Sequence, residues 1–488
     1  MKRIAIILLL LYATAQAQWT EPMQICGFEY GLLDARLSVV GDTIHVVGSG
    51  GADLYYLRST DNGRTWTEPI CPADTFEGSN MPDILCGNGY VHLVGVIYFI
   101  GERQKVFHFS SSDGGVTWSD PHLVFGDHDG FLKYPRLAVS GDTIFVSYVT
   151  SPSLLVSVSY DNGQTWYGPY RVDYGGGYCL NAFPSFFYTE GRLHLVYELA
   201  VPDDTAGIEI YHRCSDDIGI TWSDRYCLST PENSQEGKWG QAPSAYVDSL
   251  GHIISLWFDY KYGSACGVTG DILGRVSLDN GDSWLAETRL TFTQTGMCSS
   301  CLIIGDKLQV VWMDYGYYYC YWPKIMYSES TNWGSSWTEP EMISGDVERG
   351  DLSPDIDYNV SEADTILHCI FSGSLSEGIL LFYTRSQELV SIGQDIIKPH
   401  SAALSLRAYP NPFNSTTLIT CSNLKGGEIE IYNITGQLVK TLQVGSSKEG
   451  KIIWDATDAA GEKVSSGIYF ARAAGATGIR TLKLIYLK

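Results

Sequence analysis

The chain has 488 residues, enough for two to four domains of about 100–200 residues or for one large repetitive domain. Hydrophobic residues make up 44% of it and charged residues 18%, a composition that excludes a disordered chain. The 51 glycines and 32 tyrosines favour a turn-rich, all-β protein. A formal charge of −23 excludes nucleic acid as a partner, because a phosphate backbone would be repelled.

The N-terminus has the pattern of a signal peptide. A basic start at Lys2 and Arg3 precedes an apolar run from Ile4 to about Ala13. Small residues at Ala15 and Ala17 then match a signal peptidase site. We expect residues 1–17 to be a signal peptide; an uncleaved anchor is the alternative, although the run is too short to span a bilayer. No later segment is long and apolar enough to span one, so we expect an exported, monomeric mature chain without a transmembrane segment.

The twelve cysteines are scattered, which excludes a small disulfide scaffold. Cys214 and Cys227 flank one expected hairpin, where a bridge is plausible. Cys298 and Cys301 have CxxC spacing without a second pair, so we interpret them as structural and not as zinc ligands. His128 is expected in an exposed loop. No HExxH, Walker or Gly-x-Ser-x-Gly motif occurs, and we expect no metal and no cofactor.

One octapeptide, Ser-x-Asp-x-Gly-x-[Thr/Ser]-Trp, recurs six times along the middle of the chain. Its acidic side chain can accept hydrogen bonds from its own turn, its glycine supplies a positive φ, and its tryptophan anchors the hairpin. We therefore interpret its third residue as structural and not catalytic. The six third residues are Asp61, Asp113, Asp161, Asp217, Asp279 and Asn332.

Short strands precede each octapeptide and one follows it, which predicts four antiparallel strands per repeat and hence a propeller blade. The first strands begin near Arg36, Asp83, Arg136, Ser185, Ser244, Ser299 and Asp355. This count predicts a seven-bladed β-propeller over residues 18–393, with six blades as the alternative. Trp19-Thr-Glu-Pro22 resembles the sequence after the octapeptide tryptophans, so the N-terminus is expected to complete the last blade and leave no open edge.

The repeated octapeptide resembles the Asp-box (BNR) repeat of the sialidase-like propeller superfamily. The resemblance implies a propeller that can host sialidases, other glycosidases or proteins without activity, so the fold alone does not fix the function. It also implies that ligands sit over the central channel, on the face opposite the boxes.

After a linker at residues 394–405, the C-terminal part differs in charge from the rest. From Leu404 to Lys488 the chain carries ten Lys and Arg against six Asp and Glu. Short alternating strands predict a small immunoglobulin-like β-sandwich over residues 406–488. The motifs Tyr409–Phe413 (YPNPF), IYNITGQLVKTL and WDATDAAGEKVSSGIYF resemble the type A C-terminal sorting domain of the type IX secretion system. This resemblance implies that type IX secretion machinery exports the protein to the outer-membrane surface or the medium.

Polar residues at the first-strand starts and second-strand ends define the expected site. Guanidinium groups can hold an acidic group, carboxylates can bond hydroxyls, and aromatic rings can stack on sugars. We expect substrate contacts from Arg36, Arg136, Asp259, Asp314, Asp355, Tyr315 and Trp322. For a glycosidase, which needs an acid and a second group, Asp83 and Glu198 are the candidates.

Sialidases with this repeat use three arginines and an Arg-Ile-Pro motif. Here Leu and Ser follow Arg36, and Arg136 is the only other arginine expected at the start of a first strand. Recognition of a glycan or polysaccharide on the channel face is therefore the preferred hypothesis. Exo-glycosidase activity of the sialidase type and a protein-interaction propeller in the cell envelope are the alternatives.

Overall fold

The computed structural model describes residues 19–486 except 28, 52, 73–77, 99–102, 127–130, 151, 176–182, 201–206, 230–237, 268, 317–321, 347–348, 361–364, 376–377, 387–404, 410–412, 423–426, 434–436, 445–448 and 476–477. It forms two compact units, Met1–Ser391 and Ile392–Lys488. Apart from one 3-10 helix, η1 (Tyr260–Tyr262), the regular elements in the described ranges are all β-strands.

The larger unit consists of antiparallel sheets, which we number in chain order. The first contains β2 (Leu33–Val40), β3 (Thr43–Gly50) and β4 (Asp53–Ser59). The second contains β5 (Gly78–Gly87), β6 (Tyr90–Tyr98), β7 (Lys105–Ser111) and β8 (His122–Phe125). The third contains β9 (Leu132–Ser140), β10 (Thr143–Thr150), β11 (Ser153–Ser159) and β12 (Tyr167–Tyr174).

The fourth group contains β13 (Ser185–Thr189), β14 (Arg192–Ala200), β15 (Gly207–Ser215) and β16 (Tyr226–Cys227). The fifth contains β17 (Lys238–Val247), β18 (Ile253–Asp259), β19 (Asp271–Ser277) and β20 (Thr288–Arg289), and a short parallel pairing of β15 with β17 joins it to the fourth. The sixth contains β21 (Gly296–Ile304), β22 (Lys307–Asp314), β23 (Lys324–Ser330) and β24 (Glu341–Met342). The seventh contains β25 (Gly350–Val360), β26 (Thr365–Leu375), β27 (Gly378–Arg385) and β1 (Met23–Cys26). The first group has three strands and the other six have four. Four-stranded antiparallel sheets are the kind that forms propeller blades.

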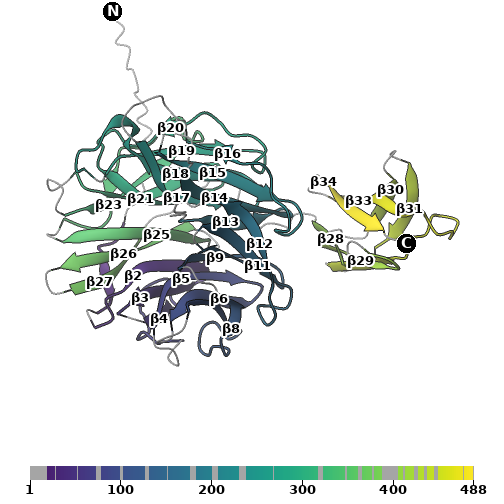
Figure 1. Cartoon of the computed structure of the whole chain (residues 1–488), viewed down its shortest axis with the longest axis horizontal. Coiled ribbons are helices and arrows are strands. Elements are labelled where there is room, and N and C mark those ends of the chain that lie inside the picture. The colour runs from purple at the N-terminus through teal and green to yellow at the C-terminus, as the bar shows by residue number, and fades with distance from the viewer. Residues whose placement is uncertain are drawn as a thin grey trace, which may run out of the picture. The chain divides into compact units, whose positions relative to one another are not determined.

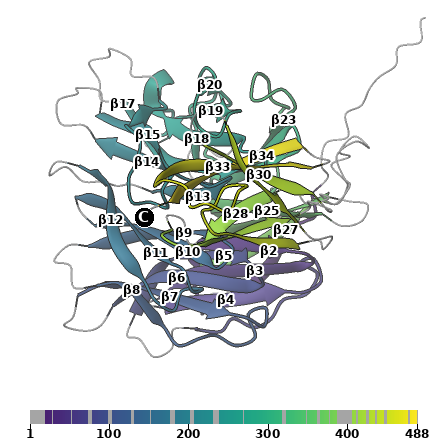
Figure 2. The same ribbon diagram turned by 90° about the vertical axis from the view of Figure 1, so that its right-hand side faces the viewer.

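The first strands of these groups contact one another in a closed cycle. Their order is β2, β5, β9, β13, β17, β21, β25 and then β2 again. In Figure 1 these strands lie toward the middle of the unit and the later strands of each group lie toward its edge. Figure 2 shows β9, β5 and β2 beside one another from a second direction, in agreement with their contacts. The first strands therefore gather around a common centre.

The N-terminal segment completes the seventh group. Strand β1 pairs antiparallel with β27, and Trp19 forms a further bridge with Ser386. The indole of Trp19 is buried and packs edge-on against Tyr327 of the sixth group, with ring centroids 5.2 Å apart. The expectation that the N-terminus closes the last sheet is confirmed, and the free edge of β27 is thereby covered.

The octapeptide turns hold their acidic residue by hydrogen bonds within the turn. In the third copy, the Thr165 N–H and Oγ1 both donate to the Asp161 carboxylate, at 2.8 and 2.6 Å, and Ser159 Oγ donates at 2.8 Å. In the first copy, the backbone and hydroxyl of Thr65 lower the pKa of Asp61 to about 2. These carboxylates are occupied by their own turns, as a structural role requires.

Replacing Asp161 by alanine is expected to lower the free energy of unfolding by about 1–2 kcal/mol, because two backbone N–H groups lose their acceptor. Asp161→Asn should cost less than half of this, since the sixth copy carries Asn332, whose Oδ1 accepts the Ser336 N–H at 2.9 Å. Urea denaturation monitored by tryptophan fluorescence compares the two variants. Equal losses would contradict the proposed role of the side-chain oxygen.

The glycine of the octapeptide also permits close packing against the preceding sheet. A Cβ on Gly115 would lie 1.8 Å from the Tyr56 hydroxyl, and one on Gly163 would lie 2.1 Å from the His108 ring. The same rings pack edge-on against the octapeptide tryptophans, Tyr56 against Trp118 at 4.9 Å and His108 against Trp166 at 5.4 Å. Each octapeptide therefore fixes one sheet against the next.

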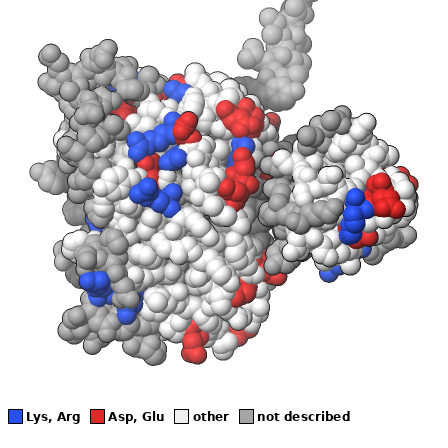
Figure 3. Space-filling model, turned by 45° about the vertical axis from the view of Figure 1, so that its right-hand side comes forward, with Lys and Arg blue, Asp and Glu red and all other residues white. Residues whose placement is uncertain are grey.

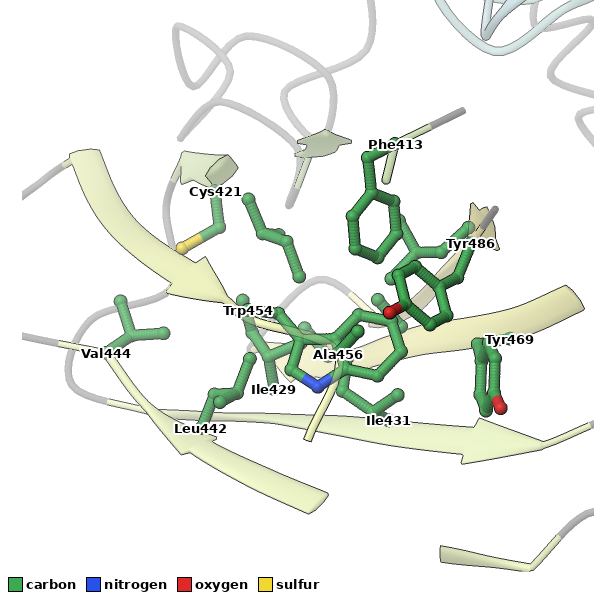
Figure 4. Packing of buried hydrophobic residues seen from close by; sticks show 14 residues of the cluster. Phe413, Cys421, Ile429, Ile431, Leu442, Val444, Trp454, Ala456, Tyr469 and Tyr486 are labelled. Atoms are coloured by element: carbon green, nitrogen blue, oxygen red, sulfur yellow. The ribbon is translucent and has the colours of Figure 1, made fainter. Parts of the chain in front are cut away.

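The C-terminal unit has two sheets around one hydrophobic cluster. One contains β28 (Ser405–Tyr409), β29 (Thr417–Ser422) and β32 (Glu449–Trp454), and the other contains β31 (Leu438–Gln443), β30 (Glu428–Asn433), β33 (Gly467–Gly475) and β34 (Gly478–Tyr486). Figure 4 shows the Trp454 ring among the side chains of both sheets. Its ring lies 5.6 Å from that of Phe413 and 5.2 Å from that of Tyr469. The unit therefore has a core of its own.

Some sequence-based expectations meet a correction or fall outside the described residues. Cys214 and Cys227 are both free, so the expected bridge between them was wrong; Cys266 is disulfide-bonded instead. The expected signal peptide and His128 lie outside the described residues, as does the linker except for Ser405, which begins β28. Within the described ranges, no helix has the length and apolar character needed to cross a membrane.

Candidate functional site

A cavity of ≈ 560 Å³ opens where the first strands meet. All seven first strands contribute to its wall. The residues predicted at the starts of the first strands, which we call the ring residues, all line it: Arg36, Asp83, Arg136, Ser185, Ser244, Ser299 and Asp355. Residues far apart in the sequence are therefore gathered around one space of the size that small-molecule and glycan sites occupy.

A β-bulge recurs in six of the first strands, at the same place in each. Over the same stretch, the first strand has one residue more than the strand it pairs with, for example between Asn80 and Asp83 in β5. The bulged residues adopt a positive φ of 39–52°, which residues other than glycine rarely do. They are Asp34, Met81, Tyr134, Ala242, Cys298 and Ser353. In four strands a proline follows, which a bulge tolerates because no ladder hydrogen bond is lost there.

The bulge explains the recurring proline before the ring residue, and it also corrects one assignment. In β5 the order is Met81, Pro82 and then the ring residue Asp83. In β21 the bulged residue is Cys298, so Ser299 occupies the proline position and Ser300 the ring position. Ser300 Oγ accordingly donates to the next ring residue, Asp355, at 2.9 Å.

Arg36 and Asp355 form one charged pair of the cavity wall. Arg36 Nη1 lies 3.9 Å from Asp355 Oδ1, and the Leu37 N–H donates to Asp355 Oδ2 at 3.0 Å. Asp355 is thus bonded by Ser300 of the sixth group and Leu37 of the first, the two groups beside its own. The side chain of Arg36 keeps 33% of its surface exposed, so its guanidinium remains available to a ligand.

Asp83 and Arg136 are a second acid and base of the cavity wall, from adjacent sheets, whose charges act on each other. The Leu137 N–H donates to Asp83 Oδ2 at 2.8 Å. Burial raises the pKa of Asp83, and the nearby Arg136 and Arg36 guanidiniums partly offset that rise. Burial also lowers the pKa of Arg136 to about 10, helped by the charge of Arg36. The two arginines therefore line the same cavity and their charges act on each other.

Asp357 is a wall residue that sequence reasoning missed. The Val39 N–H donates to Asp357 Oδ2 at 2.7 Å, and burial raises the pKa of Asp357 to about 7. It stands two residues after Asp355 on β25, and alternate residues of a strand share a face. The spacing of two residues from Asp355 was therefore the feature of the sequence that could have identified Asp357 as a wall residue.

Glu198 lies behind the cavity wall and not on it. It stands on β14, is 2% exposed, and accepts the Ala242 N–H at 2.9 Å. Ala242 itself is a bulged residue of the wall. Burial raises the pKa of Glu198 to about 8, so its carboxyl group is protonated below that pH. A protonated carboxyl group at neutral pH is what a general acid requires.

Four expected contact residues do not reach the cavity wall as the structure describes it: Asp259, Asp314, Tyr315 and Trp322. Asp259 caps η1 by accepting the Lys261 N–H at 2.8 Å, and Asp314 accepts the Gly316 N–H and the Thr295 hydroxyl, both at 2.8 Å. Asp259, Asp314 and Tyr315 lie at second-strand ends, one layer further from the axis than the first strands, and Trp322 follows in the loop before β23. Of the described second-strand residues, only Phe258, beside Asp259 in β18, lines the cavity.

The arrangement can bind an anionic or hydroxyl-rich ligand. Arg36 and Arg136 are the only arginines among the described wall residues. Arg58 and Arg385 instead donate to the octapeptide backbone at Gly114 O and Asn62 O, as expected for features of the repeat. On the face drawn in Figure 3, the charged side chains of the larger unit stand in separate groups, some of both signs and some of one, between wide uncharged areas.

Comparisons with known proteins identify the tail and the fold. Residues 407–487 match the model of the secretion system C-terminal sorting domain. No curated protein matches the chain. Among solved structures, an ulvan lyase of polysaccharide lyase family PL25 is 13% identical with a TM-score of 0.52, covering 74% of this chain and 95% of its own.

A second structure of a PL25 ulvan lyase, bound to -[GlcA(1-4)Rha3S]-, is 13% identical with a TM-score of 0.51 over the same shares of both chains. A protein of unknown function from Dyadobacter fermentans is 15% identical with a TM-score of 0.46, covering 76% of this chain and 99% of its own. At these identities the ulvan lyases show the fold alone. The chain therefore carries a secretion system C-terminal sorting domain after a unit that shares its fold with the ulvan lyases, and is exported by type IX secretion.

Proposed function

We propose that this protein binds a glycan in the central cavity of a seven-bladed Asp-box propeller. The observation that carries the proposal is the position of Arg36 and Arg136 beside Asp83 and Asp355 on one cavity wall. Guanidinium groups donate paired hydrogen bonds to carboxylate or sulfate groups, and the aspartates can accept from sugar hydroxyls. The ligand would be a glycan that carries an acidic group.

The wider organisation belongs to the same proposal. A signal peptide at residues 1–17 would direct export, residues 18–393 would form the propeller, and residues 394–405 would link it to an immunoglobulin-like sorting sandwich at residues 406–488. The protein would then act at the outer-membrane surface or in the medium, where polysaccharides are encountered. The polysaccharide substrate named for the ulvan lyases agrees with this class of ligand.

Exo-glycosidase activity is a second candidate, favoured by the raised pKa values of Glu198 and Asp83. Of the two, Asp83 lines the cavity and could serve as the acid, whereas Glu198 lies behind the wall; a glycosidase pairs a protonated carboxyl group with a second group. Hydrolysis of aryl-glycosides by the wild-type protein, lost in Asp83→Asn or Glu198→Gln, would support it. Binding without any hydrolysis leaves recognition as the function.

The binding proposal is tested by affinity electrophoresis in gels containing ulvan, alginate, polygalacturonate, heparin or laminarin. We expect an acidic polysaccharide to retard the protein, and Arg136→Gln to weaken that binding about tenfold to a hundredfold, the size of a hydrogen bond to a charged group. Arg192→Gln is the matched control, because Arg192 pairs with Asp216 and Asp282 outside the cavity. If none of the five polysaccharides retards the wild-type protein, or if both variants behave alike, the proposal is wrong.

A further inference from the structure

Tyr262, Arg289 and Phe292 form an exposed cluster in the fifth group, which we call the aromatic platform. The Arg289 guanidinium lies 3.9 Å from the centre of the Tyr262 ring and 4.6 Å from that of Phe292. Phe292 is 70% exposed and Tyr262 41% exposed. Two large aromatic rings thus stand in solvent around one cation, an arrangement that core packing does not require.

Hydrogen bonds to the protein fix the conformation of the platform. Arg289 Nη2 donates to the fully buried Asp271 at 2.6 Å, and Arg289 Nε donates to the Thr291 carbonyl at 2.9 Å. Gln294 Nε2 donates to the Tyr262 carbonyl at 2.6 Å, and the Gln294 N–H donates to Asp271 at 3.0 Å. Because these bonds fix the guanidinium and both loops, little conformational freedom remains to be lost when a ligand binds.

The platform also offers a hydrogen-bond donor beside its rings. Nε and Nη2 of Arg289 are used within the protein, whereas Nη1 makes no hydrogen bond to the part of the chain that the structure describes. A sugar ring has an apolar face of C–H groups that packs on an aromatic ring, and hydroxyl or acidic groups at its edge. Phe292 and Tyr262 suit the first feature and Arg289 Nη1 suits the second.

The platform is joined to the cavity by two short segments. Phe258 lines the cavity and is followed by Asp259 and η1, which ends at Tyr262. Phe292 precedes the wall residue Met297, and a chain of that length spans at most about 18 Å. Figure 1 shows β17 to β20 running from the middle of the unit to its edge, with β20, which ends at Arg289, outermost.

We infer that the platform is a second sugar-binding subsite, and that the ligand is an oligosaccharide or polysaccharide reaching from the cavity across the fifth group. This inference rests on the proposed glycan binding in the cavity. A sugar unit would stack on Phe292 and Tyr262 while Arg289 Nη1 bonds one of its oxygens. Chain length, and not the terminal sugar alone, would then determine affinity.

The test measures binding of the most strongly retarding polysaccharide among the five and of its two-sugar fragments. Phe292→Ala and Tyr262→Ala should each weaken binding of the polymer roughly tenfold, the size of a lost aromatic contact with its buried area. Neither should change binding of the two-sugar fragments, measured by calorimetry. Tyr167→Ala is the control, since Tyr167 is 52% exposed beside the octapeptide of the third group. Unchanged melting temperatures would show that the exposed substitutions leave the fold intact.

The outcomes separate the two proposals. If Phe292→Ala and Tyr262→Ala bind the polymer like the wild type while Arg136→Gln does not, the platform inference is wrong and cavity binding stands. If the platform variants lose the polymer and Arg136→Gln keeps it, cavity binding is wrong and the platform is the primary site. If no polysaccharide retards the wild-type protein, both proposals are wrong.

Discussion

Replacing Asp351 by asparagine is expected to lower the free energy of unfolding by about 3–5 kcal/mol, the cost of removing one partner from a buried ion pair. Lys324 and Asp351 are fully buried, 3.3 Å apart, and Arg349 also donates to Asp351. Burial lowers the pKa of Lys324 and raises that of Asp351, which shows that each charge depends on the others. Without the carboxylate, two buried cations would lose the buried anion that both contact.

Urea denaturation of Asp351→Asn provides the measurement, and Asp216→Asn provides the control. Asp216 pairs with Arg192 at 2.7 Å, but its side chain is 71% exposed, so its removal should cost less than about 1 kcal/mol. Adding Lys324→Met to Asp351→Asn should recover part of the loss, since one of the two buried cations is then removed. Equal losses for the two aspartate variants would contradict the role of burial.

Acid is expected to destabilise the larger unit between about pH 6.5 and pH 4, because six histidines are buried in neutral form. Burial lowers the pKa of His45, His92 and His194 to about 4 and that of His212 and His368 to about 3, and it also lowers the pKa of His108 well below its usual range. In this range the unfolded chain binds protons that the folded chain does not, so stability falls as the pH falls. Glu198 and Asp357, with raised pKa values, act in the opposite direction.

A reciprocal pair of substitutions isolates the histidines. His92 Nδ1 lies 3.1 Å from His108 Nε2, whereas in the first sheet the equivalent ring to His108 is Tyr56, 2.8 Å from His45 Nδ1. His108→Tyr should reduce the dependence of the unfolding free energy on pH between 4.5 and 6 by about 1.4 kcal/mol per pH unit. Tyr56→His should increase it. Urea denaturation at several pH values measures both, and identical slopes would contradict the assignment.

The arrangement of the ring was predictable because the octapeptide marks the same turn in every sheet. Once that turn is fixed, the first strand of each repeat can be located, and Arg36, Asp83, Arg136 and Asp355 follow. The position of the ring in β21 was missed because Ser299 stands where four other first strands carry the proline that precedes the ring residue. Without that proline, the sequence does not show which of the neighbouring serines, Ser299 or Ser300, takes the ring position.

Two further features required the structure. Asp259 and Asp314 end second strands as expected, yet that layer lies behind the wall, where their carboxylates cap local turns. The aromatic platform depends on a stack between residues of three separate segments, Asp271, Tyr262 and Arg289–Phe292. No local pattern marks these residues, since each is unremarkable until the fold brings them together.

Closure of the seventh sheet by the N-terminal strand has a consequence for the order of folding. Thr20 bonds Thr384, 364 residues away, so the two ends of the unit must meet before either is stable. During synthesis, β1 is made first, and its partner β27 is made only after almost all of the unit. Contacts of such long range make folding slow and leave the last edge open to other chains meanwhile.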